Sequence, residues 1–84
     1  MNRELFRQFL KLQNISDKGV INRVCWAMEI EEKFNINLDQ VCKSSDKTIK
    51  LLKDIKDCAA LKKRQKRNFE VGLLSYYEFY NNKK

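Results

Sequence analysis

The chain has no proline and only two glycines in 84 residues. Tight β-turns depend on these two residue types, because proline presets one backbone angle and glycine tolerates positive φ. An all-β sandwich or barrel needs a turn roughly every 8–12 residues. The composition therefore excludes such folds and favours helices joined by short polar connections. A chain of this length supports one small domain, which we expect to span residues 1–84.

Hydrophobic periodicity predicts an amphipathic helix at about 3–13 and a longer one at about 17–34. The longer helix follows Ser16, a residue type whose side chain accepts hydrogen bonds from a helix start. Apolar residues cover roughly 260° of its circumference, so we expect neighbouring helices on several of its sides. Trp26 lies on this apolar surface, and we expect it in the core.

Three further elements complete the predicted fold. Residues 34–38 form an ordered loop, and Asp39 is expected to cap a single helical turn that ends near Cys42. A lysine-rich helix then runs from 44–46 to about 58–60, and the last helix carries most of the remaining aromatic residues. The predicted fold class is all-α, a compact four-helix bundle with one extra short helical turn.

The lysine-rich helix has two interpretations. Lys50 and Asp54, like Lys53 and Asp57, are spaced i, i+4, which is typical of a solvated face with weak ion pairs. The same lysine face is also suited to contact DNA, and the spacing alone leaves both possibilities open.

No enzyme class is indicated. Histidine is absent, which excludes Ser-His-Asp and Cys-His nucleophiles and imidazole metal sites. Cys25, Cys42 and Cys58 form no CxxC pair, so we expect reduced thiols packed as small apolar residues in a cytoplasmic protein. The longest charge-free stretch has seven residues, against roughly 20 in a membrane span. We expect no catalytic residue, cofactor, metal or membrane partner.

The net charge of +7 is confined to the second half of the chain. Residues 1–42 contain six basic and six acidic side chains, whereas residues 43–84 contain twelve basic and five acidic ones. A localised excess of this size is the electrostatic pattern of a protein with a polyanionic partner.

A basic cluster stands where the last helix is expected to begin. Five cations occupy the six positions 62–67. A helix N-terminus carries positive partial charge, so cations there are unfavourable for folding. A bound phosphate removes this conflict, because backbone N–H groups and flanking cations together form an anion site. The alternative is a solvated loop that only promotes solubility.

The order of these elements resembles the N-terminal SAM-like core-binding domain of phage-type tyrosine recombinases (integrases). The match covers nearly the whole chain. It is carried by Ser16, which opens the long helix, and by Leu73, Tyr76 or Tyr77, and Phe79 in the last helix. The sequence departs from the family pattern at three places: Gly19 and Arg23 stand where Thr and Tyr are typical, and Ser75 stands near the usual Arg.

The resemblance implies half of a clamp around duplex DNA. In such a clamp, Ser16, Lys18 and Arg23 would form one contact region, and the basic cluster would form the second. A recombinase also needs a catalytic domain with Arg, His and a nucleophilic Tyr, and this histidine-free chain has no room for one. We therefore expect either a stand-alone relative that binds DNA or a protein without recombining DNA, or an isolated domain of a longer enzyme.

These observations lead to one main hypothesis and one alternative. The first is a non-catalytic duplex-DNA-binding domain of mobile-element or phage origin that contacts mainly phosphates. The alternative is a small phage or mobile-element protein-interaction module, a regulator or inhibitor, that docks an acidic protein surface. A homodimer through the aromatic last helix is a further possibility. The candidate nucleic-acid contacts are Lys62, Lys63, Arg64, Lys66, Arg67, Ser16, Lys18, Arg23, Lys47 and Lys50.

Overall fold

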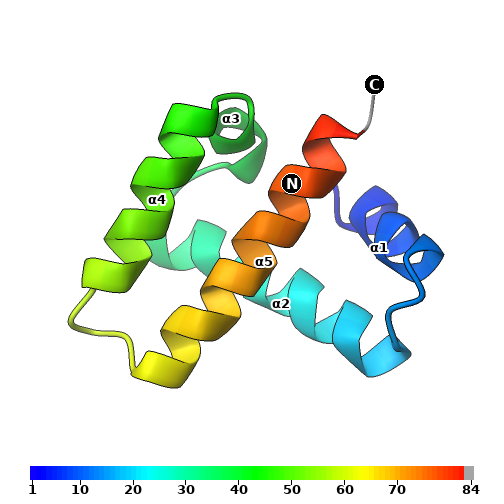
Figure 1. The fold of residues 1–84 in the computed structure, drawn as a ribbon, viewed down its shortest axis with the longest axis horizontal. Helices are drawn as coiled ribbons and strands as arrows, with labels where there is room; N and C mark the ends of the chain where they lie inside the picture. Colours follow the sequence, from blue (N-terminus) through cyan, green and yellow to red (C-terminus); the bar gives the residue numbers. More distant parts are fainter. Residues whose placement is uncertain (83–84) are drawn as a thin grey trace.

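Two long helices, α2 (Asp17–Phe34) and α5 (Lys63–Asn81), cross at the centre of the molecule (Figure 1). Helix α1 (Arg3–Leu12) packs against both of them at one end, and α3 (Leu38–Cys42) and α4 (Ser45–Asp57) pack against α5 on its other side. This computed structural model describes residues 1–82, so the last two residues of the predicted domain lie outside it. The all-α prediction, with four longer helices and one short one, is confirmed.

Polar side chains begin each of the first four helices. The predicted Ser16 cap is confirmed, because its Oγ accepts a hydrogen bond from Gly19 N–H at 3.2 Å. The predicted cap of α3 is wrong: Asn37 Oδ1 accepts from Asp39 N–H at 2.8 Å, which leaves Asp39 inside the first turn and available for other contacts. The four capping side chains are Asn2, Ser16, Asn37 and Ser44.

Asparagine takes the role of glycine where the chain must turn. Asn14, after α1, and Asn35, after α2, adopt φ values of 59° and 51°. Asparagine tolerates this left-handed conformation better than most residues do. A chain with only two glycines can therefore still reverse direction after both helices.

Gly72 serves helix packing instead. At Gly72 on α5, an added Cβ would lie 2.9 Å from Trp26 Cβ and 3.2 Å from the backbone nitrogen of Ala27. Helices α2 and α5 thus approach each other closely because Gly72 has no side chain. Trp26 is only partly buried against the core, whereas we expected it inside.

The predicted burial of α2 on several sides is wrong. Its buried residues are Val20, Ala27 and Ile30, whereas Ile21 and Met28 are 57% and 37% exposed. Within residues 1–82, α2 packs mainly against α5 and α1, whereas α4 packs against α3 and α5, so part of the apolar surface of α2 stays exposed.

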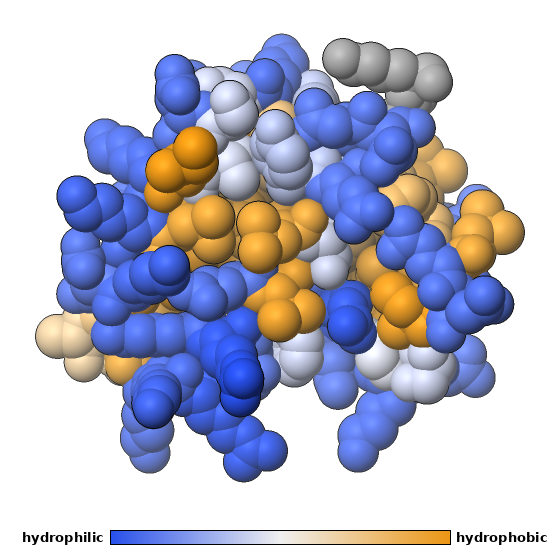
Figure 2. Space-filling view, in the orientation of Figure 1, coloured by the Kyte–Doolittle hydropathy of each residue, from blue (hydrophilic) through white to orange (hydrophobic). Residues whose placement is uncertain are grey.

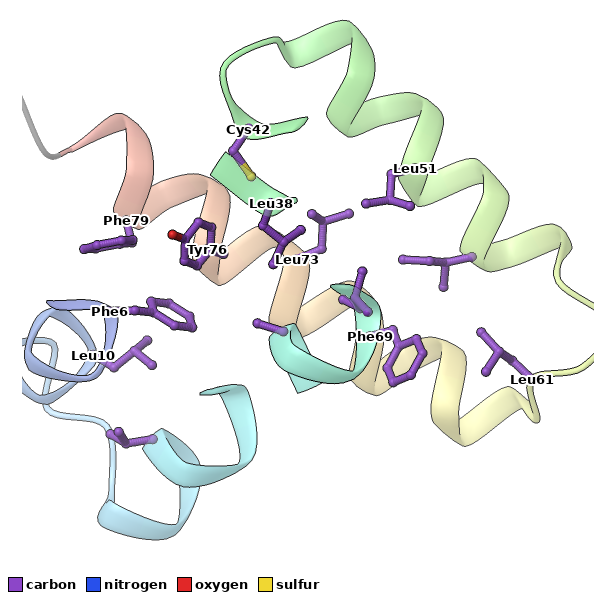
Figure 3. Packing of buried hydrophobic residues seen from close by; sticks show 14 residues of the cluster. Phe6, Leu10, Leu38, Cys42, Leu51, Leu61, Phe69, Leu73, Tyr76 and Phe79 are labelled. Atoms are coloured by element: carbon purple, nitrogen blue, oxygen red, sulfur yellow. The ribbon is translucent and has the colours of Figure 1, made fainter. Parts of the chain in front are cut away.

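Aromatic residues of α5 form part of the core together with α1 (Figure 3). The ring of Tyr76, which is fully buried, meets Phe6 edge-on with centroids 4.9 Å apart. Phe79 packs against Phe6 and Phe9 at 5.4 and 5.5 Å. Edge-on and tilted contacts of this kind add to the stabilisation from burial of the rings.

A polar cluster surrounds the hydroxyl of Tyr76. This hydroxyl donates to Asp39 Oδ1 and accepts from Asn2 N–H at 3.1 Å. The Met1 ammonium lies 3.3 Å from Asp39 Oδ2 and 3.4 Å from Glu31 Oε2. Burial, and then the hydrogen bond to Asp39, raise the pKa of Tyr76 above its ordinary value. The cluster links the chain start to α2, α3 and α5.

The three cysteines differ in environment. Cys42 is fully buried in the core, Cys58 is half-buried, and Cys25 is exposed, so the prediction of three packed thiols is wrong for Cys25. Burial raises the pKa of the Cys42 thiol from 9.0 to about 12, against a smaller lowering effect of its hydrogen bond with Thr48.

Within residues 1–82, no helix combines the length and apolar character of a membrane span.

The close approach at Gly72 predicts the effect of adding one methyl group. In an uncrowded helix, Gly→Ala stabilises by about 1 kcal/mol. Gly72→Ala should instead lower the free energy of unfolding in urea by about 1–3 kcal/mol, because the new Cβ meets backbone and near-backbone atoms of α2. The control is Gly19→Ala, whose Cβ would have side-chain atoms of Ile15, Arg23 and Ser16 as its three nearest neighbours and should cost less, because side chains can shift more easily than backbone. A Gly72→Ala protein as stable as the wild type would contradict this packing.

The buried thiol predicts a loss of stability at alkaline pH. Because the folded protein holds the Cys42 proton more tightly than the unfolded chain, this contribution is complete below pH 9 and declines as the pH rises toward about 12. The test is urea unfolding at pH 8 and pH 10.5 under reducing conditions. The wild type should lose more stability between these pH values than Cys42→Ala does. Equal losses in the two proteins would rule out a contribution from this thiol.

Candidate nucleic-acid interface

The structure places the basic cluster at the start of α5. Lys62 is the N-cap residue and α5 begins at Lys63, so the other four cations lie in its first turns. The Lys62 backbone N–H donates to Gln65 Oε1 at 3.0 Å. The Lys62 side chain gives the helix no capping hydrogen bond, in contrast to the caps of the other four helices. Apart from the Lys62 N–H, the backbone N–H groups of this turn, which have no partner within the helix, are therefore left without a side-chain acceptor.

The first turn of α5 also lacks an acidic residue. Each of the other four helices has one there, as expected from the helix dipole: Glu4, Asp17, Asp39 and Asp46. In α5 these positions carry cations instead. The start of α5 is thus the one helix start, among those described in residues 1–82, where local charge opposes folding.

Helix α4 adds a cation to this cluster that sequence reasoning missed. Lys56, near the end of α4, faces the start of α5 across a shallow groove of about 730 Å³. The lining of the groove contains five cations and one acid: Lys56, Lys63, Arg64, Lys66, Arg67 and Glu70. We call this the basic groove. Lys62 belongs to the predicted cluster but not to the lining.

Lys66 has a structural contact as well as a charge. Its Nζ donates to the backbone oxygen of Lys56 at 2.6 Å, near the end of α4. The side chain is half-buried, whereas Lys63, Arg64 and Arg67 are exposed. With the exposed Lys56, four cations of the basic groove are therefore free to meet a ligand without loss of a side-chain contact inside the fold.

The two predicted lysines of α4 lie away from the basic groove. At 100° per residue, Lys50 and Lys47 are about 120° and 180° around α4 from Lys56. Both are exposed. The predicted ion pairs on this flank are absent from the described part of the chain, where neither Asp54 nor Asp57 lies within 4.0 Å of a lysine nitrogen. The sequence could have shown this difference. Counting 100° per residue from Lys56 puts Lys47 and Lys50 on another side of the helix.

The predicted contacts at the start of α2 also form a separate region. Ser16 caps α2, and Arg23 is half-buried with its Nη1 donating to Gly19 O at 3.1 Å. Of these three residues, only Lys18 is exposed and makes no side-chain hydrogen bond or ion pair within residues 1–82. The starts of α2 and α5 are at distant ends of two crossing helices (Figure 1), so the structure does not join these residues to the basic groove.

The chemistry available in the basic groove is anion binding. Lys and Arg donate hydrogen bonds and carry permanent charge at neutral pH. In residues 1–82, no three Cys, Asp or Glu side chains come together as a metal site would need.

Comparisons with protein-family models, curated proteins and solved structures find no match to this chain.

Proposed function

We propose that this chain is a non-catalytic duplex-DNA-binding domain of mobile-element or phage origin, which holds backbone phosphates in the basic groove. The observation that carries the proposal is the start of α5, where cations replace both the cap and the acid that every other helix has. This arrangement is unfavourable for the isolated protein. A phosphate accepts from the uncapped N–H groups and pairs with the cations, so binding relieves the conflict.

Duplex phosphates fit this surface better than unpaired bases do. Single-strand binding proteins stack bases on exposed aromatic rings. In α5, Tyr76 and Phe79 are buried, and Tyr77 and Tyr80 are half-buried against the core. The exposed groups of the basic groove are cations, which bind backbone phosphates without reading the sequence. The sequence resemblance to recombinase core-binding domains supports the same type of ligand.

The proposal predicts a steep dependence of DNA binding on salt. With about five phosphate contacts, log K falls against log salt with a slope of about −4.5. Affinity for a random duplex should then drop about 500-fold between 50 mM and 200 mM salt, as measured by fluorescence anisotropy. Binding that does not change over this range would exclude phosphate contacts as its main source.

Charge-matched variants locate the contact. Replacing Lys63, Arg64 and Arg67 with Gln should weaken duplex binding and make the salt slope shallower by about 2.7. It should preserve or slightly raise the thermal midpoint, because three unfavourable charges leave the helix start. The control replaces Lys43, Lys47 and Lys50 with Gln, which removes equal charge from exposed positions of the lysine-rich segment. An equal loss of binding in both variants would show that only net charge matters.

The acid of the basic groove provides a test in the opposite direction. Glu70 is half-buried among the cations and would repel a bound phosphate. Glu70→Gln should therefore tighten duplex binding several-fold at 50 mM salt. The control is Glu78→Gln, two turns along α5, where the same change in net charge should have a smaller effect. Weaker binding by Glu70→Gln would place DNA elsewhere on the molecule.

A further inference from the structure

A strip of apolar side chains adjoins the basic groove. Ile49 on α4 is 63% exposed, Leu74 on α5 is 49% exposed, and Leu52, three residues after Ile49 on α4, is half-buried. Figure 2 shows apolar atoms gathered over the middle of α4 and α5, with hydrophilic atoms below them. We call Ile49, Leu52 and Leu74 the apolar strip.

Helical register puts the apolar strip and the basic groove on one face. On α5, Leu74 lies eleven residues after Lys63, which is about 16 Å along the helix and only about 20° around it. On α4, Ile49 lies seven residues before Lys56, again about 20° around the helix. The hydrogen bond from Lys66 to Lys56 O joins the two cationic ends. Each helix thus presents an apolar residue at one end of the face and a cation at the other.

Neither DNA nor a second copy accounts for this pattern. The backbone of a duplex is charged and hydrated, so it gains little from exposed isoleucine and leucine. A second copy paired through the apolar strip supplies no acidic surface for the basic groove, whose lining has five cations and one acid, and two chains of net charge +7 repel each other. An occupant needs apolar groups for the strip and negative charge for the groove.

We propose that this face docks an acidic amphipathic helix of a partner protein. Apolar side chains spaced i, i+4 would cover Ile49 and Leu74, and Asp or Glu about two turns further along would meet Lys63 and Arg67. A helix of about three turns spans the 16 Å between the two ends. This inference goes beyond the proposed DNA function and does not rest on it. Because both ligands use the same cations, the partner helix and DNA would compete.

The probe is a displayed library of helix-forming peptides of about 18 residues with one randomised face, selected against the full chain. Selected peptides should share an apolar i, i+4 pair and acidic residues about two turns away. Their binding in solution should fall about tenfold or more with Leu74→Ser, Ile49→Ser or Arg67→Gln. The matched control is Leu12→Ser, because Leu12 is 84% exposed on α1, and it should bind as the wild type does. The mutated positions are exposed, so thermal unfolding should confirm that every variant folds.

Duplex binding by the same variants separates this inference from the proposed function. Leu74→Ser and Ile49→Ser should keep wild-type DNA affinity and salt slope, whereas Arg67→Gln should lose both peptide and DNA binding. Peptides that bind equally well to all variants, or that lack acidic residues, would overturn the inference. Self-association in sedimentation that Leu74→Ser abolishes would also overturn it, because the occupant would then be a second copy. If the wild-type chain does not bind duplex DNA, the proposed function is wrong, but the peptide measurements still test this inference.

Discussion

The close crossing of α2 and α5 at Gly72 is the contact on which the rest of the molecule depends. Because Gly72 has no Cβ, the α5 backbone can lie against Trp26 and Ala27. The central position of α5 then gives α1, α3 and α4 a common surface to pack on. Helix α4 reaches the basic groove only through its packing on α5, so the position of Lys56 follows from this crossing.

The polar cluster at Tyr76 stabilises the other end of α5. A buried hydroxyl is costly unless its hydrogen bonds are made, and here it both donates and accepts. Asp39 is available for this contact because Asn37 caps α3 in its place. Two carboxylates also offset the charge of the Met1 ammonium. Local capping and tertiary packing are therefore coupled through a single aspartate.

The two ends of α5 show opposite relations between charge and stability. Near Tyr76, every polar group that the cluster brings together finds a partner within the fold. At the start of α5, Lys62 supplies no capping acceptor, and among the cation side chains there only Lys66 makes a hydrogen bond within residues 1–82. A fold can retain such an unfavourable start when the remainder of the core is well packed, as it is around Phe6 and Leu73. The start of α5, where capping and helix-dipole preferences are not met, is also where we propose that ligands bind.

The amino-acid sequence by itself determined the helices, their order and the position of the basic cluster at a helix start. These features depend on local signals: the spacing of apolar residues, the Ser16 cap, and cations adjacent in the chain. Tertiary structure decided which side of each helix is covered. It left Cys25 exposed, put Lys56 in the groove and kept Lys47 and Lys50 out of it. The reason is that helical periodicity defines the faces of one helix, whereas the choice of neighbour depends on close contacts such as the one at Gly72.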